Sequence, residues 1–132
     1  MIVIAPIGYA INGSSDGIAP TFGGIVSAIN TGIFREVKLT WNLSLDSDVI
    51  NYDIYYSTVN NAATILSEGI KASAPSSSNY IIIGGLTNTQ YHYFIVRARD
   101  TAGNRDSNVN IIALQPTNGN LPETIKRPGR VR

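Results

Sequence analysis

The sequence predicts an all-β domain, and its length, its composition and its short alternating segments carry this prediction. The chain has 132 residues, the usual size of one domain with its own core. Charged residues make up 14% and hydrophobic residues 43%, a balance that argues against coiled coils and wholesale disorder. Twelve Gly, six Pro and many Ser, Thr and Asn supply the turns of a sandwich or small barrel of short strands.

Five segments have the alternation or the β-rich composition of strands. They cover residues 37–41, 50–56, 80–83, 91–99 and 109–114. Clusters of turn-forming residues separate them at 44–48, 74–79, 87–89 and 101–104. Helical spacing of apolar residues is interrupted everywhere by Gly or Pro, so no segment is predicted as a helix.

We expect a compact domain at residues 19–116, between an apolar arm at 1–18 and a basic tail at 117–132. The apolar stretch from Ile2 to Ile11 is too short to cross a membrane as a helix, and it lacks the basic start of a signal peptide. If Met1 is the natural start, the protein is expected to stay in the cytoplasm where it is made.

The charge is unevenly distributed, although it sums to +1. Residues 121–132 hold four basic groups and Glu123, a net +3, and residues 1–120 hold six basic and eight acidic groups, a net −2. A specific nucleic-acid partner is not predicted, because such proteins usually have a basic body with interleaved aromatics. Two interpretations of the tail stay open: a solvated terminus, or a contact with phosphate or an acidic protein surface. Its basic groups are Lys126, Arg127, Arg130 and Arg132.

Four segments carry a family resemblance: residues 19–24 (APTFGG), 37–41 (VKLTW), 52–57 (YDIYYS) and 85–104, which contains FIVRARDTAGN. They resemble the first three strands and the corner, sixth strand and following turn of fibronectin type III domains of the bacterial and phage type. The resemblance covers about residues 19–116. It implies a seven-stranded Greek-key sandwich of two sheets, immunoglobulin-like, without a cofactor.

One position departs from the family pattern. In the family, a Tyr six residues after the corner Leu bonds back to the backbone, and counting from Leu86 leads to His92. In this register the residues that alternate from His92 to Ala98 point inward, whereas a one-residue slip would bury Arg97 and Arg99. We therefore predict that His92 points inward and bonds to the backbone near Leu86. The predicted core residues are Leu39, Trp41, Ile54, Leu86, His92, Phe94 and Val96.

No catalytic residue or metal ligand is predicted, and the protein is not expected to be an enzyme. Cysteine is absent, which excludes a disulfide framework, a zinc-thiolate site and a cysteine nucleophile. The carboxylates Asp46, Asp48 and Asp53 invite a calcium or glycosidase interpretation, but their spacing matches no calcium-binding loop. They fall where the turn before the third strand and that strand itself are expected, so a solvated loop is the favoured interpretation. The segment from Asp100 to Asp106 is interpreted as a hairpin turn rather than a metal loop.

The outward side chains of the expected third and sixth strands form the candidate interaction face. They are Tyr55, Tyr91, Tyr93, Ile95, Arg97 and Arg99. Exposed Tyr and Arg are typical of interfaces, and such a face could also stack on sugar rings. The competing interpretation is ordinary cross-strand pairs that stiffen the sheet.

Two functions fit this pattern. The first is a structural subunit of a phage virion, on the capsid or associated with the tail, because virion proteins are made without export and often contain domains of the resembled family. Its arm and tail would hold it in a homo- or hetero-oligomer. The apolar residues of the arm include Ile2, Ile4 and Ile7. The alternative is a carbohydrate- or protein-binding module of a secreted bacterial surface protein or enzyme.

Overall fold

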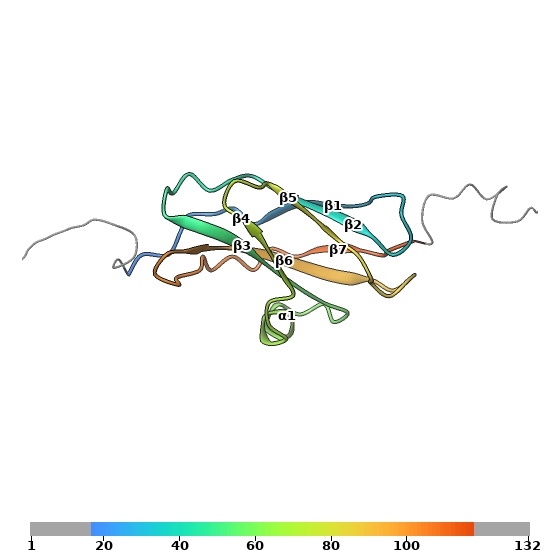
Figure 1. Cartoon of the computed structure of the whole chain (residues 1–132). Coiled ribbons are helices and arrows are strands. Elements are labelled where there is room, and N and C mark those ends of the chain that lie inside the picture. Colours follow the sequence, from blue (N-terminus) through green and yellow to red (C-terminus); the bar gives the residue numbers. More distant parts are fainter. Residues whose placement is uncertain (1–16, 118–132) are drawn as a thin grey trace, which may run out of the picture.

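Two antiparallel sheets pack face to face in the computed structural model, which describes residues 17–117 (Figure 1). The three-stranded sheet has the order β1–β2–β5 and the four-stranded sheet the order β4–β3–β6–β7. The expected seven-stranded sandwich is thereby confirmed. Its elements are β1 (Ile25–Asn30), β2 (Val37–Trp41), β3 (Val49–Ser57), α1 (Ala62–Ser67), β4 (Ala72–Pro75), β5 (Tyr80–Ile83), β6 (His92–Asp100) and β7 (Ile112–Leu114).

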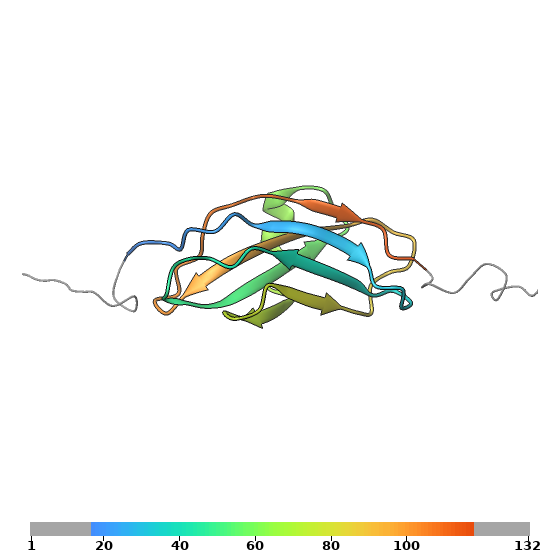
Figure 2. The ribbon, with the colours of Figure 1, turned by 90° about the horizontal axis from the view of Figure 1, so that it is seen from above.

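Three elements differ from the strands expected from the sequence. The first hydrogen-bonded strand is β1, which follows residues 19–24 rather than coinciding with them. The short strand β4 forms at the start of an expected turn, because residues 72–75 pair with β3. The last strand has three residues instead of six, and Figure 2 shows it beside β1 at one side of the sandwich.

Side chains explain why β7 is short. The N–H of Ala98 in β6 donates to Asp106 Oδ1 at 2.7 Å, and Asn108 Nδ2 donates to the Val96 carbonyl at 2.9 Å. These side chains occupy positions on β6 that the backbone of a longer β7 would otherwise fill. The chain returns to regular pairing only at Ile112, opposite Phe94.

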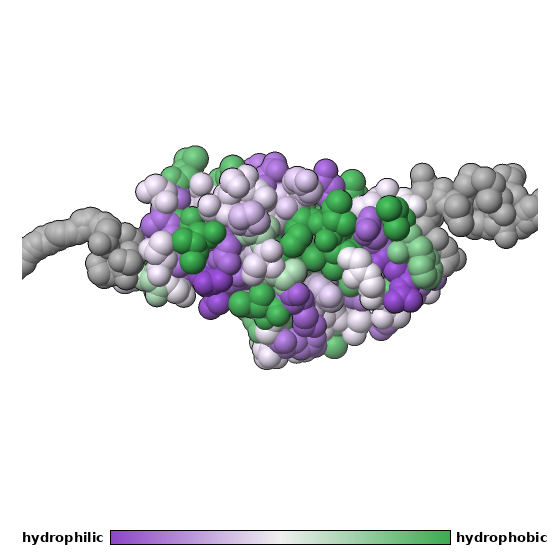
Figure 3. Space-filling model, viewed as in Figure 1, coloured by the Kyte–Doolittle hydropathy of each residue, from purple (hydrophilic) through white to green (hydrophobic). Residues whose placement is uncertain are grey.

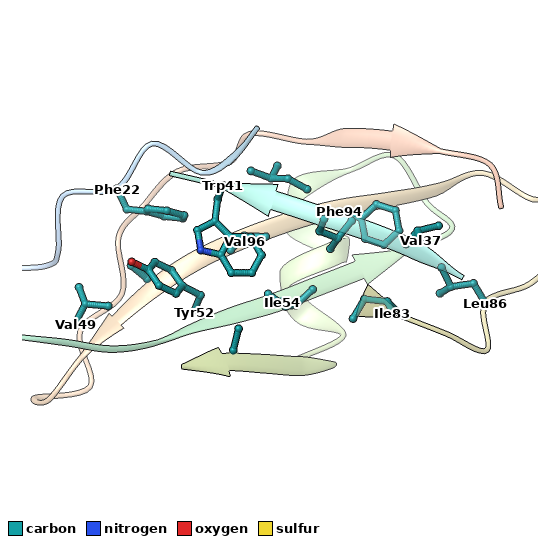
Figure 4. Close-up of a cluster of buried hydrophobic side chains, with 14 residues drawn as sticks. Phe22, Val37, Trp41, Val49, Tyr52, Ile54, Ile83, Leu86, Phe94 and Val96 are labelled. Carbon is teal, nitrogen blue, oxygen red and sulfur yellow. The ribbon is translucent and has the colours of Figure 1, made fainter. Parts of the chain in front are cut away.

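The core lies between the sheets and centres on Trp41, which is 1% exposed (Figure 4). Its ring centroid is 5.4 Å from that of Tyr52, and its Nε1–H donates to the Ser78 carbonyl at 3.0 Å. The seven residues predicted for the core are all buried: Leu39, Trp41, Ile54, Leu86, His92, Phe94 and Val96.

The faces of β6 follow the predicted register. His92, Phe94, Val96 and Ala98 are buried between the sheets, and Arg97 and Arg99 lie on the outer face, where they are half-buried. The two ends of the described chain, at Gly17 and Thr117, lie at opposite ends of the sandwich (Figure 1).

Candidate functional site

The outer face of the four-stranded sheet, where the sequence placed its interaction residues, is partly covered by a helix. Helix α1 packs on the middle of this face through Ile65, which is fully buried with Tyr55 and Ile95. Tyr55 is only 6% exposed, so its prediction as an exposed interaction residue is wrong. The reason is the helix, which the sequence interpretation did not anticipate. Burial also raises the pKa of the Tyr55 phenol.

The helix is short and depends on local signals. Asn61 caps it, because Asn61 Oδ1 accepts a hydrogen bond from the Thr64 N–H at 2.9 Å. After Glu68, the chain leaves the helix at Gly69, whose φ of +88° is unfavourable for other residues. Six residues are too few for a visible helical period and too few for a stable isolated helix, so packing on Tyr55 and Ile95 stabilises α1.

Beyond the helix, the same face holds a cluster of charges around Asp53. This residue was expected to be solvated, but it is 0% exposed in β3, the strand predicted at residues 50–56. Arg99 Nε donates to Asp53 Oδ2 at 3.0 Å and Arg105 Nε donates to it at 2.7 Å. The hydroxyl of Ser73 donates to Asp53 Oδ1 at 2.9 Å. The expectation of solvation fails because two arginines and a hydroxyl compensate the buried carboxylate.

Arg97 and the tyrosine pair lie on opposite sides of the helix contact along β6. Arg97 Nε donates to the Asn108 carbonyl at 2.9 Å. At the other end, Tyr91 is 52% exposed and stacks on Tyr93, with ring centroids 6.4 Å apart. Because Ile95 beneath α1 separates these groups, the predicted face consists of an arginine end and a tyrosine end rather than one continuous strip.

His92 points inward and is 4% exposed. Its Nδ1 lies 2.8 Å from the Gln90 carbonyl, so its backbone contact is two residues away rather than at Leu86. The ring also meets Tyr56 edge-on, with centroids 6.1 Å apart. Desolvation lowers the pKa of His92, which keeps the buried ring neutral.

The remaining carboxylates stabilise turns. Asp100 Oδ1 accepts hydrogen bonds from the N–H groups of Ala102 and Asn104, at 3.0 and 2.8 Å. Asp46 accepts one from the Thr21 N–H. No group of three metal-ligating side chains occurs within residues 17–117. The turn predicted between Asp100 and Asp106 is present, and its carboxylates accept hydrogen bonds from backbone N–H groups.

The outer face of the three-stranded sheet is a second candidate, which the sequence interpretation missed. Ile29, Tyr80 and Ile82 are 53%, 48% and 48% exposed there. Lys38 lies among them, with its Nζ 4.8 Å from the centre of the Tyr80 ring. Figure 3 shows apolar side chains gathered around β5, on the side of the molecule where β4 and β5 are the sheet edges. The sequence feature that could have predicted this face is the run from Tyr80 to Ile83, because a strand that is apolar on both faces leaves apolar side chains on its outer face.

The predicted arm and tail residues lie outside the described part of the chain. They are Ile2, Ile4, Ile7, Lys126, Arg127, Arg130 and Arg132. In the part that is described, no helix is long and apolar enough to cross a membrane.

Comparisons with known proteins identify the fold through solved structures. No family model matches the sequence, and no curated protein matches it. The chicken CNTN1 FN1–FN3 domains match with a TM-score of 0.60 and 13% identity, over 87% of this chain and 36% of that one. The third fibronectin III domain of the human KIAA0343 protein matches with a TM-score of 0.59 and 16% identity, over 86% and 95%.

A bacterial enzyme is also similar in part. The Clostridium perfringens spore cortex lytic enzyme SleM matches with a TM-score of 0.51 and 13% identity, over 74% of this chain and 28% of the enzyme. This chain thus spans about a third of the CNTN1 structure and less of SleM. The shared architecture, which the sequence resemblance predicted, shows that the described part of this chain has the fibronectin type III fold.

Proposed function

We propose that this protein is a non-enzymatic interaction subunit, and specifically a structural subunit of a phage virion that decorates the capsid or belongs to the tail. The observation that carries the interaction role is the open outer face of the three-stranded sheet. Ile29, Tyr80 and Ile82 expose about half of their surface there. Apolar side chains grouped on a sheet face gain free energy when a partner covers them.

The buried polar groups support a structural rather than a catalytic role. Asp53 is paired with arginines, His92 contacts a backbone carbonyl, and Asp100 and Asp106 accept backbone hydrogen bonds. Each of these groups therefore has a partner that explains its burial.

The arrangement of the chain ends supports a role in assembly. Gly17 and Thr117, where the described part of the chain begins and ends, lie at opposite ends of the sandwich (Figure 1). We propose that the apolar arm with Ile2, Ile4 and Ile7 pairs with a sheet edge of a neighbouring subunit. The basic tail, with Lys126 and Arg127 among its charges, would contact an acidic surface.

The mass of the native assembly tests this proposal. Light scattering of the full chain, with electron microscopy of the same sample, is expected to show a defined multiple of 14.2 kDa. Ile82→Lys should reduce this mass, whereas Leu45→Lys should leave it unchanged, because Leu45 is 100% exposed in the loop between β2 and β3. A monomeric wild-type chain at all concentrations would contradict the assembly role.

Two truncations separate the extensions. Removal of residues 1–18 should weaken a contact that is insensitive to salt, since it depends on apolar burial and backbone bonds. Removal of residues 117–132 should abolish a contact that weakens as salt rises, because exposed charges are screened over about 8–10 Å at ordinary ionic strength. Full assembly by both truncated chains would show that the extensions are passive and would favour the alternative below.

The alternative is a carbohydrate- or protein-binding module of a secreted bacterial surface protein or enzyme. The stacked rings of Tyr91 and Tyr93 favour it, because exposed aromatic faces suit sugar rings. The similarity to part of SleM, an enzyme that acts on the spore cortex, is consistent with it. Binding of the full chain to a glycan array, lost in Tyr91→Ala, would support this alternative over the virion subunit.

A further inference from the structure

Three arginines gather at one end of the outer face of the four-stranded sheet. Arg97 and Arg99 alternate along β6, and the backbone of Arg105 forms an isolated bridge with that of Arg99. Arg97 lies opposite Asp53 in the register of β3 and β6. The cluster thus combines side chains from two sheet strands and the segment that follows the turn after β6.

Asp53 holds two of these side chains in place. Its Oδ2 accepts hydrogen bonds from Arg99 Nε and Arg105 Nε, and the carboxylate is completely buried beneath them. The side chains of Arg99 and Arg105 stay 27% and 35% exposed. A buried anchor with exposed guanidinium groups lowers the conformational entropy that a binding partner would have to remove.

The three arginines have more N–H donors than the protein acceptors beside them bind, and more positive charge than Asp53 neutralises. One carboxylate, that of Asp53, faces three guanidinium groups, so these four side chains together carry a charge of +2. Within residues 17–117, Arg97 and Arg99 bond to protein acceptors through Nε, and their Nη groups have no protein acceptor. The nearby carboxylates of Asp100 and Asp106 are buried and bonded to N–H groups.

We infer that Arg97, Arg99 and Arg105 form a recognition surface for the carboxylates of an acidic segment of a partner protein. The planar guanidinium matches a carboxylate with two parallel hydrogen bonds. An acidic peptide fits better than a nucleic acid, because nucleic-acid-binding proteins usually have a basic body with interleaved aromatics, whereas residues 1–120 carry a net charge of −2 and offer only this local group of arginines. This inference deepens the proposed interaction role and rests on it, but it concerns a surface separate from the β1–β2–β5 face and from the tail.

Titration of the full chain with a blocked hexaglutamate peptide tests this inference, with hexaglutamine as the uncharged control. In NMR spectra at about 0.1 M salt, where exposed charges are screened beyond roughly 10 Å, hexaglutamate should shift the amides of β3 and β6 near Asp53 and Arg97. Arg97→Gln should weaken binding by roughly three- to fivefold, the scale of one exposed ion pair. Arg97→Lys keeps the charge without the planar fork and should lose part of the affinity.

Two controls identify the site. Arg35→Gln also removes one positive charge, but Arg35 lies over the Phe34 ring between β1 and β2, so hexaglutamate binding should change little. A full chain with the four basic tail residues changed to Gln should still bind the peptide at β6. The inference is overturned if Arg35→Gln weakens binding as much as Arg97→Gln, if neutralising the tail abolishes binding, or if a single-stranded oligonucleotide binds more tightly than hexaglutamate.

Light scattering of the same samples separates this inference from the assembly proposal. A monomeric wild-type chain that binds hexaglutamate at β6 would contradict the assembly role and support the arginine surface. An assembled chain without hexaglutamate shifts around Arg97 would overturn the arginine surface and leave the assembly role intact.

Discussion

Gly23 and Gly24 are neighbours in the chain, but only Gly24 should resist replacement by alanine. Gly24 has a φ of +89°, and a Cβ placed there would lie 2.7 Å from Asn108 Oδ1. The left-handed backbone costs an alanine about 1–2 kcal/mol. Displacing Asn108 would also break its bonds to the Val96 carbonyl and the Asn110 N–H, each worth about 1 kcal/mol.

These contributions predict a large loss of stability. Alanine restricts the unfolded chain and returns about 0.4–1 kcal/mol, so Gly24→Ala should lower the free energy of unfolding by roughly 2–3.5 kcal/mol. Urea unfolding can be followed by the fluorescence of Trp41, the only Trp in the chain. Equal midpoints for Gly24→Ala and the wild type would refute the reasoning.

Gly23→Ala is the matched control. No atom lies within 4 Å of a Cβ built at Gly23, and its φ lies outside the left-handed region. Its free energy of unfolding should therefore stay within about 0.5 kcal/mol of the wild type. If both variants lost the same stability, the contact with Asn108 would not be the cause.

Three further predictions concern the core, the histidine and the helix. Trp41→Ala should cost about 3–5 kcal/mol in urea melts, and a loss below about 1 kcal/mol would mean that the ring is not packed between the sheets. Desolvation lowers the pKa of His92 below its ordinary value of 6.5, so the unfolded chain binds more protons than the folded chain when the pH falls below about 6.5. The free energy of unfolding should therefore fall as the pH drops from about 6.5 through the lowered pKa. His92→Phe should flatten this dependence in urea melts between about pH 7 and 5, and an unchanged slope would exclude His92 as its source. Ile65→Ala should lower the free energy of unfolding by about 2–4 kcal/mol, or let α1 detach from the sheet, which faster hydrogen exchange of the α1 amides would reveal. Unchanged stability and unchanged exchange would contradict the role of Ile65 in holding α1 on the sheet.

Alternation along the strands was the most informative part of the sequence. It predicted which side chains of β2 and β6 enter the core, because a strand between one buried and one outer face repeats every two residues. The position of Trp41 between the sheets and the outward direction of Arg97 follow from the same pattern.

The candidate site was harder to predict, because its features depend on contacts between distant segments. Helix α1 has only six residues, so its one visible signal was the capping Asn61. Without α1, the position of Tyr55 on an outer strand face implied exposure. The burial of Asp53 was similarly hidden, because its partner Arg105 is 52 residues away in the sequence.

The side-chain bonds between β6 and residues 106–108 have a consequence for aggregation. Because β7 pairs only with the first part of β6, the backbone groups of Val96 and Ala98 would otherwise be open to pairing with a strand of another molecule. Asp106 and Asn108 occupy the Ala98 N–H and the Val96 carbonyl. Substitutions there would therefore increase misassembly at high concentration, in addition to lowering the free energy of unfolding.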